Sequence, residues 1–369
     1  MLIRDETKKQ ADWGLLLLVL LIGLIGAVTL YSAAASDTDS QQWNLFFRQL
    51  TWLSGGLALI LVSLLFNHKT LYVWAEGLYL FCIGLLLAVV FFGTEAGGAR
   101  RWLPVGPIAI QPSEFVKLAV VVILAKYYAR HTGEGRLSLR QLIIPFILIA
   151  VPFALIKSQP DLGTALIMVL VAVSMTAFVG IARRTLYFLT GLTVIFLPLT
   201  WLFFLHDYQK ERILTFLNPN RDPLGAGYHI IQSKIAIGSG MITGKGFLKG
   251  TQNALAFLPE QHTDFIMSVL AEEWGLIGTS FVLLLYLLII IWAISIAYHC
   301  RDMFRMILAV GVAAMIFWPV FINAGMVMGL LPVVGVPMPL ISYGGSSTVA
   351  FLLGIALLLN VSRKRTSIE

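Results

Sequence analysis

The side chain with the clearest chemical potential in this sequence is Asp264, which stands where a long apolar run begins. It closes the polar stretch 258–265, Leu-Pro-Glu-Gln-His-Thr-Asp-Phe. An ionised aspartate that reaches a hydroxyl can take its proton, so the position suits general-base catalysis. A carboxylate is also favoured at a helix N-terminus, where it would act as a cap. Thr263 could supply such a cap, and the pattern alone leaves both interpretations open.

Two further groups near Asp264 are candidates. If a helix begins by Asp264, residues 264, 268 and 272 line one face, so Glu272 follows Asp264 on the same side, with Glu273 beside it. His262 could be a base or a ligand, although a hydrogen-bonding loop residue is the simpler interpretation. No other histidine has zinc-ligand spacing to it, which argues against a zinc site.

Glu114 and Lys117 form another candidate, early in the apolar run that follows Gln-Pro-Ser at 111–113. Residues three apart share a helix face. Charges at membrane depth are costly and usually face a bundle interior or a wet cavity. The pair is therefore predicted to form a polar floor under an outer cavity, with a purely structural ion pair as the alternative.

Asp161 lies in a short connection, residues 157–164, between two apolar runs. It could cap the helix that follows. However, Glu114, Asp161 and Asp264 are all expected near the same membrane boundary. Several carboxylates around one site suit general-base chemistry or a divalent cation, Mg²⁺ or Mn²⁺, held by oxygen ligands. No organic cofactor is expected.

Basic residues on the same side predict an anionic substrate such as a diphosphate. Arginine offers phosphate a bidentate fork. The glycine-rich stretch 234–249 resembles a phosphate cradle but lacks the P-loop pattern, so a nucleotidase is rejected. For any single lysine, attraction to anionic lipid headgroups is the competing interpretation. The candidate anion ligands are Arg100, Arg101, Lys210, Arg212, Lys234, Lys245 and Lys249.

The elements that must position these side chains are membrane-spanning helices. Hydrophobic residues make up 58% of the 369 positions, charged residues only 12%, and the mean hydropathy is +0.86. The fold class predicted is therefore an all-α polytopic membrane protein, a single domain over 1–369. One long loop, about 206–263, separates the seventh and eighth spans. The ten predicted spans are 13–32, 47–66, 71–92, 113–129, 142–157, 163–181, 185–205, 265–298, 304–328 and 346–361.

The distribution of basic residues predicts the orientation. Fifteen of the 26 lysines and arginines fall in the termini and loops of one side, against four in the short connections of the other. Both termini are therefore expected in the cytoplasm and the long loop outside. The net charge of +7 is spread over membrane-flanking loops, which argues against nucleic-acid binding. Cys82 and Cys300 lie at different depths, so no disulfide is expected.

The connections that are elaborate all fall on the predicted outer side. Residues 93–112 have the glycines and prolines of a shaped loop, and residues 329–346 are apolar but full of helix breakers. Irregular backbone at membrane depth is tolerated only when it is buried in protein or lines a cavity. The second segment is therefore predicted to be a re-entrant wall, and the one-sided elaboration favours an enzyme over a transporter.

Seven segments, in order along residues 93–350, resemble the SEDS family (shape, elongation, division and sporulation). They are 98–102 (Gly-Ala-Arg-Arg-Trp), 111–117 (Gln-Pro-Ser-Glu-Phe-Val-Lys), 159–164 (Gln-Pro-Asp-Leu-Gly-Thr), 222–229 (Asp-Pro-Leu-Gly-Ala-Gly-Tyr-His), 238–252, 258–265 and 339–346 (Pro-Leu-Ile-Ser-Tyr-Gly-Gly-Ser). The short tails, and the stretch Arg-Ile-Leu-Thr-Phe-Leu-Asn-Pro before Asp222, resemble the elongation branch more than the division branch.

The resemblance implies a peptidoglycan glycosyltransferase of the bacterial inner membrane that polymerises lipid II on undecaprenyl diphosphate during cell-wall elongation. It implies that Asp264 is catalytic and that Trp102, Glu114, Lys117 and Asp161 line or support the cavity. It also implies a class B penicillin-binding protein, a transpeptidase, as partner. Inverting transfer with Asp264 as general base then follows as a hypothesis. The alternatives are a lipid II flippase and a scaffold that only anchors the transpeptidase.

Overall fold

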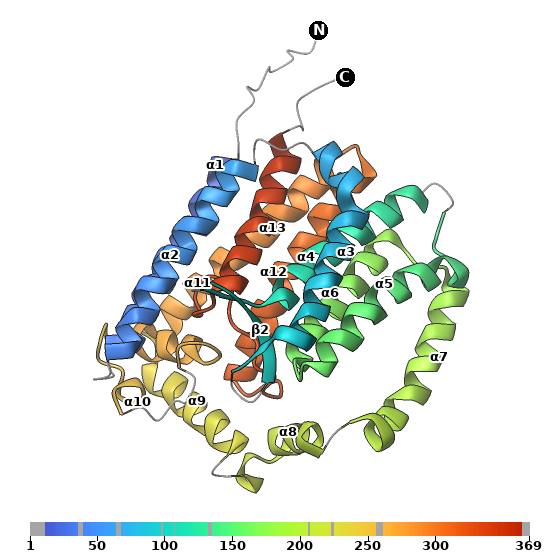
Figure 1. Cartoon of the computed structure of the whole chain (residues 1–369). Helices are drawn as coiled ribbons and strands as arrows, with labels where there is room; N and C mark the ends of the chain where they lie inside the picture. The colour runs from blue at the N-terminus through green and yellow to red at the C-terminus, as the bar shows by residue number, and fades with distance from the viewer. Residues whose placement is uncertain are drawn as a thin grey trace.

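Helices build almost the whole molecule, and strands occur only at one end of it (Figure 1). The computed structural model describes residues 12–35, 40–63, 68–96, 99–106, 108–131, 135–205, 207–222, 225–255 and 261–363. The long helices are α1 (Trp13–Ala35), α2 (Ser40–Ser63), α3 (His68–Phe92), α4 (Pro112–His131), α5 (Leu139–Ser158), α6 (Leu162–Val179), α7 (Arg183–Leu199), α11 (Ile266–His299), α12 (Met303–Val327) and α13 (Gly345–Arg363).

Nine helices among the described residues are long and apolar enough to cross a membrane. The remaining predicted span, the fourth at 113–129, corresponds to α4, which carries several charged residues and is buried along most of its length. Because other helices surround α4, its charged residues do not have to face lipid. These helices confirm the prediction of an all-helical polytopic membrane protein, and α11, with 34 residues, is as long as the sequence indicated.

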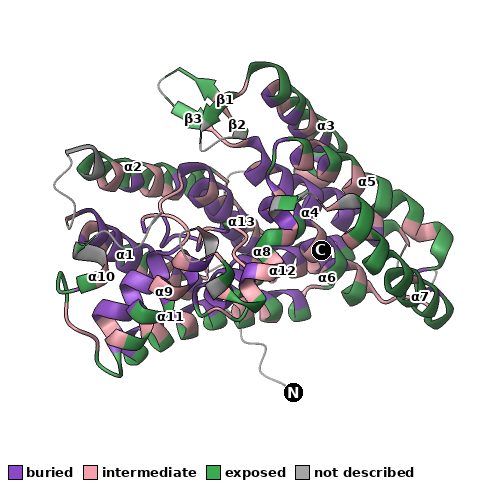
Figure 2. Cartoon of the chain, turned by 90° about the horizontal axis from the view of Figure 1, so that it is seen from below, coloured by how far each residue is buried: buried purple, intermediate pink, exposed green. Residues whose placement is uncertain are grey.

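The core of the bundle consists of α4, α11, α12 and α13, with other helices around them. Helix α11 packs on α12, α12 on α4 and α6, and α13 on α2. Figure 2 shows α4, α12 and α13 mostly buried and α11 with a buried and an exposed face, while α7 lies at the edge of the molecule and is mostly exposed. Of the residues of α7, all of which the structure describes, only Thr185 is buried. Helix α7 therefore contributes little to the packed core.

The first and last helices meet at one end of the bundle. Ser362, in the last turn of α13, donates a hydrogen bond to the carboxylate of Asp12, just before α1. The strands and the helices of the long connection lie at the opposite end (Figure 1). We call that opposite end the outer end, following the orientation that the sequence predicts.

Residues 94–110 at the outer end form a small antiparallel sheet, which the sequence analysis expected only as a shaped loop. Its strands are β1 (Thr94–Ala96), β2 (Ala99–Val105) and β3 (Ile108–Ile110), with β2 in the middle. Val105 pairs with Ile108 around a tight turn, and Ala96 pairs with Ala99. The strands are too short for a two-residue alternation to reveal them in the sequence.

In its described residues, the predicted long loop, about 206–263, contains three α-helices, α8 (Asp207–Leu217), α9 (Ala226–Gly240) and α10 (Thr251–Ala254), and a 3-10 helix at Pro219–Arg221. Helix α9 packs against the first turns of α11. Its contact face carries small residues, Ser233, Ala236 and Gly240, which allow the two backbones to approach closely. A Cβ on Gly240 would lie 2.0 Å from the carbonyl oxygen of Ala271, so only glycine fits at that position.

Candidate functional site

The segment that carries Asp264 is held at three successive carbonyl groups. The carbonyl of His262 accepts from the Tyr343 N–H at 2.8 Å, and that of Thr263 accepts from the Ser342 hydroxyl at 2.6 Å. The carbonyl of Asp264 itself accepts from the side-chain amide of Asn323 at 2.9 Å. Fixing the backbone on both sides of a carboxylate fixes the direction of its side chain, which is the arrangement that a general base requires.

The residues that hold this segment belong to α12 and to the irregular chain after it. We call residues 329–344 the wall segment. Asn323 is completely buried and also donates to the carbonyl of Val336 in the wall segment at 2.7 Å, so one amide ties α11, α12 and the wall together. Residues 336–342 are mostly buried and have no regular secondary structure. This confirms the sequence-based prediction of an irregular segment enclosed in protein.

The side chain of Asp264 lies against the wall segment. A Cβ built on Gly335 would be 3.2 Å from the Oδ2 atom of Asp264. Asp264 is partly exposed, unlike the acids described next. It is not the N-cap of α11, because Phe265 holds that position and makes no side-chain cap. The carboxylate is therefore directed at the wall rather than at the start of its own helix.

Glu114 and Lys117 form an ion pair at 2.9 Å near the outer end of α4. Both residues are buried, with exposures of 5% and 6%. They line a cavity of about 20 Å³ together with residues of the wall segment, Val336, Pro337 and Pro339. That volume is close to the space of one water molecule. The ion pair that the sequence offered as the alternative is therefore present, and it borders a small cavity beneath the wall; its role as the floor of a substrate cavity stays a prediction.

Asp161 caps α6 and joins it to the start of α4. One of its oxygens accepts from the Thr164 N–H at 3.3 Å. The other accepts from the Gln111 amide at 3.0 Å and from the Ser113 hydroxyl at 3.4 Å. The cap that the sequence offered as an alternative is therefore present, and the same carboxylate holds the Gln-Pro-Ser segment that precedes Glu114.

The basic residues of β2 are placed differently from one another. Arg101 donates to the carbonyls of Gln159 and Pro160, and so binds the sheet to the connection that carries Asp161. Arg100 is exposed and pairs with Glu95 at 2.8 Å. Trp102 lies in the middle of the same strand and is partly buried. The sheet therefore packs on α3 and α4, and Arg101 ties it to the connection that precedes α6.

Of the remaining candidates, Lys210 and Arg212 lie in α8 and Lys234 in α9, whereas Lys245, Lys249 and His262 lie around the first turns of α11. Lys245 pairs with Glu272 at 2.6 Å. Lys249 is exposed, and His262 is partly buried. Glu272 and Glu273 are both buried inside the outer end of the bundle. The anion-binding roles predicted for these lysines stay predictions, and for Lys245 the structure adds a second role, argued below.

The wall segment is the element that brings the predicted acids together. Its Gly335 lies against Asp264, and its Val336 and Pro337 line the cavity of Glu114. On a third side, a Cβ on Gly163, two residues from Asp161, would be 3.0 Å from the carbonyl oxygen of Val334. The wall segment thus lies against Asp264, lines the cavity of Glu114 and contacts the first turn of the helix that Asp161 caps. That the three acids form a common site stays a prediction.

These acids do not form a ready metal site in the part of the chain that the structure describes. No group of three or more His, Cys, Asp or Glu side chains there could hold a metal ion. Glu114 is paired with Lys117, and Asp161 is used by three hydrogen-bond donors. The residues as arranged do not fit a preformed cation centre. The divalent cation stays a prediction, and the mechanism proposed below uses none.

Asn323 is a site residue that the sequence analysis missed. It is a lone amide in the apolar helix α12, and its only signal is that a polar side chain at membrane depth is costly. Ser342 fell within one of the segments of family resemblance, but nothing in the sequence indicated that its hydroxyl would hold residue 263. Both residues act through the backbone carbonyls of distant segments, and spacing along the chain cannot show such contacts.

Comparison with known proteins identifies what this chain resembles. The family model described as "Cell cycle protein", which groups FtsW, RodA and SpoVE, matches residues 10–367. The peptidoglycan glycosyltransferase MrdB of Escherichia coli strain K12 is 41% identical over 368 residues, which cover 98% of each protein.

Two solved structures have the same fold. One, described as "Structural coordination of polymerization and crosslinking by a peptidoglycan synthase complex", matches with a TM-score of 0.82 at 34% identity, over 96% of this chain and 98% of that one. The rod shape determining protein RodA of Thermus thermophilus matches with a TM-score of 0.70 at 30% identity, over 99% of this chain and all (100%) of that one.

Proposed function

This chain belongs to the SEDS family, and from that membership and the site geometry we propose that it polymerises lipid II into glycan strands, with Asp264 as the general base. It is a peptidoglycan glycosyltransferase similar to MrdB and RodA, and a multi-pass protein of the bacterial inner membrane. The substrate, the mechanism and the role of each residue are our proposal.

The proposed reaction is a single displacement. Asp264 takes the proton from the 4-hydroxyl of the terminal GlcNAc of the acceptor lipid II. The oxygen forms a bond to the anomeric carbon of the donor strand, whose bond to undecaprenyl diphosphate breaks, and the electron pair leaves with the diphosphate. Going from an α-linked diphosphate to a β-1,4 bond inverts the anomeric centre, so one base is enough and no covalent enzyme intermediate is required.

The observation that carries the proposal is the triple backbone anchorage of Asp264. Hydrogen bonds to the carbonyls of residues 262, 263 and 264 come from a neighbouring helix and from the wall segment, and the carboxylate remains partly exposed. A helix cap would need no such anchorage. A base must be held still and must also be reachable by its substrate, and Asp264 satisfies both requirements.

The leaving diphosphate needs positive charge, and we propose Arg100 and Lys249 for this role. Both side chains are exposed at the outer end. The partner of Arg100, Glu95, is exposed as well, and an exposed ion pair contributes so little that a diphosphate can replace it. Arg101 is less suited, because its guanidinium already binds two carbonyls of the 159–160 connection.

A class B penicillin-binding protein is the proposed partner. The structural relative with the TM-score of 0.82 is described as part of a peptidoglycan synthase complex. A transmembrane helix of the partner would fit the outward face of α11, where large apolar side chains recur every three or four residues. That face consists of Ile277, Phe281, Leu284, Leu288 and Ile291, each at least 40% exposed.

The test is polymerisation of purified lipid II by the full-length protein and its Asp264→Asn variant. The variant is expected to fold normally, by thermal unfolding, and to make no polymer. Asp302→Asn is a matched control, because Asp302 caps α12 at the opposite end of the bundle and should tolerate the change. Polymer from Asp264→Asn at the normal rate would exclude this residue as the base.

The same assay separates the alternative functions. A flippase would move lipid II across vesicles without making polymer, and a scaffold would do neither. In both cases the wild-type protein would give no glycan strands, whatever the variants do. The elaborate connections of the described chain, which gather at one end of the bundle, support an enzyme that works on one side of the membrane (Figure 1).

A further inference from the structure

The helical backbone of α11 is interrupted at Gly275, and a neighbouring loop forms hydrogen bonds with backbone groups that the interruption leaves without helical partners. Gly275 has φ 65° and ψ −164°, which interrupts the helical backbone. The N–H groups of Leu276 and Ile277 donate to the carbonyls of Met241 and Ile242, at 2.9 and 3.1 Å. Unsatisfied backbone groups are expensive at membrane depth, so this loop is needed for α11 to be broken there.

The exchange runs in both directions. The carbonyls of Glu272 and Glu273, just before the break, accept from the N–H groups of Lys245 and Gly246, both at 3.0 Å. Residues 241–246 thus supply both donors and acceptors to the interrupted helix. The first turns of α11, which follow directly on Asp264, are held by this loop as well as by α9.

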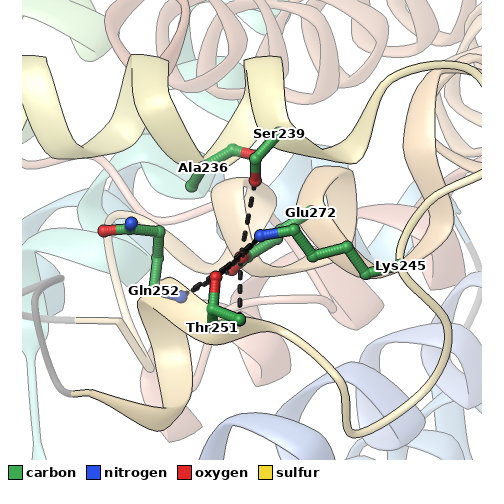
Figure 3. Close-up of polar contacts among 6 residues, drawn as sticks. All are labelled: Ala236, Ser239, Lys245, Thr251, Gln252 and Glu272. Carbon is green, nitrogen blue, oxygen red and sulfur yellow. Dashed lines mark hydrogen bonds and ion pairs between the residues drawn. The ribbon is translucent and has the colours of Figure 1, made fainter.

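The side chain of Glu272 adds a second set of bonds at the same place (Figure 3). Its carboxylate has no exposed surface. One oxygen accepts from Lys245 Nζ at 2.6 Å, from the Thr251 N–H at 2.8 Å and from the Thr251 hydroxyl at 3.0 Å. The Gln252 N–H donates to both oxygens, at 3.1 and 3.3 Å. A carboxylate, which has two acceptor oxygens, suits such a convergence of donors.

These bonds hold Thr251 and Gln252, which precede Asp264 by about a dozen residues, against α11. Gln252 and Thr251 are bound to Glu272, whereas the carbonyls of residues 262–264 are bound to Asn323 and the wall segment. The chain is therefore held to α11 at Thr251 and Gln252, through Glu272, and is held again at residues 262–264, through α12 and the wall segment.

We propose that Glu272 is a positioning residue, whose carboxylate holds Lys245, Thr251 and Gln252 against the break in α11 and thereby keeps Asp264 directed at the wall segment. The proposal rests on the proposed role of Asp264 as general base. Replacing the carboxylate by an amide leaves one acceptor oxygen for several donors, and the loop is released. Asp264 then loses its alignment with the acceptor hydroxyl, while Arg100 on β2, which is proposed to bind the diphosphate, is untouched.

The kinetic test compares Glu272→Gln, Lys245→Met and the double variant in lipid II polymerisation by the full-length protein. For Glu272→Gln we expect kcat to fall on the order of 100-fold, the size of a small misplacement of a catalytic group, and KM to change much less, because Arg100 stays in place although Lys249 lies in the released loop. The double variant should be no slower than the slower single variant, since both changes break one shared contact. If Lys245 instead binds the diphosphate, Lys245→Met will raise KM and leave kcat as it is.

The structural test is trypsin cleavage after Lys249, which is exposed within the held loop. Mass spectrometry should show faster cleavage there in Glu272→Gln than in the wild-type protein. Glu76→Gln is the matched control, because it breaks another acid–lysine pair, Glu76 with Lys126, near the other end of α4. That control should change neither kcat nor the rate of cleavage after Lys249.

Three results would overturn the proposal: normal kcat in Glu272→Gln, a loss confined to KM, or an unchanged rate of cleavage after Lys249. If Glu272→Gln does not fold, the Lys245→Met variant tests the proposal instead. It should fold, because Thr251 and Gln252 still donate to the Glu272 carboxylate, and its kcat should fall because the loop loses one of its contacts; a normal kcat would overturn the proposal. Asp264→Asn is assayed in parallel. If it is inactive while Glu272→Gln is normal, only the positioning role fails; if it is active, the proposed base is wrong.

Discussion

Helix α4 carries the lysine of an acid–lysine pair near each of its ends: Lys117 pairs with Glu114 of the same helix and Lys126 with Glu76 of α3, and the two pairs are built differently. At the outer end, the Lys117 and Glu114 side chains are both enclosed, with exposures of 7% and 6%. Near the other end, Lys126 is enclosed, but the side chain of its partner Glu76 is 51% exposed. Desolvating two charges costs more than desolvating one, and a buried pair often does not recover that cost. The outer pair is therefore difficult to explain by stability alone, and it borders the candidate site.

The largest expected effect comes from breaking the enclosed pair. Lys117→Met leaves the Glu114 carboxylate buried without its cation, and removing one partner of a buried pair costs about 3–5 kcal/mol. We expect a lower thermal unfolding midpoint and no polymerisation. The double variant Glu114→Gln/Lys117→Met removes both charges, so it should regain much of the stability without regaining activity. A Lys117→Met protein as stable as wild type would contradict the difference between the two ends.

The sequence predicted those parts of the site that are visible as charge in an apolar context. Glu114, Lys117, Asp161 and Asp264 stand at the edges of apolar runs, where a charged residue must be either solvated or paired. The helical fold followed from the same apolar runs, and the wall segment followed from its prolines and glycines. In each case the physical cost is local to the chain, so the sequence alone reveals it.

What the sequence could not predict depends on contacts between distant segments. The bonds from Asn323 to residues 264 and 336 need the wall segment to fold back onto α12. The role of Glu272 depends on the conformation of Gly275, and regular helical spacing gives no sign of a break there. Helix α9 was hidden because its small residues, which suit close packing on α11, are also typical of loops.

The second prediction tests whether the polymerisation rate depends on the wall segment beside Asp264 or equally on any part of the outer end. Gly335 has φ 75°, and a Cβ there would lie 3.2 Å from the Asp264 carboxylate. Gly335→Ala should slow polymerisation about 10-fold, through backbone strain of about 1–2 kcal/mol and displacement of the carboxylate. Initial rates with purified lipid II measure the effect.

Gly106→Ala is the matched control for that experiment. Gly106 also has a positive φ, 62°, at the outer end, but a Cβ there would meet nothing within 4 Å. The backbone strain is similar in the two variants, whereas only Gly335→Ala crowds Asp264. Equal losses in the two variants would mean that strain anywhere in the outer end is damaging, and the wall segment would lose its special role.

The smallest effect is expected at the partly exposed pair. Glu76→Gln keeps an oxygen that can accept from Lys126, and the Lys126 ammonium also lies 4.9 Å from the centre of the Tyr72 ring. Water reaches Glu76, and pairs with an exposed partner contribute about 0–1 kcal/mol. The unfolding midpoint and the polymerisation rate should both stay close to wild type. A loss as large as that of Lys117→Met would show that exposure does not distinguish the two pairs, and the enclosed charges at the outer end would then need no functional explanation.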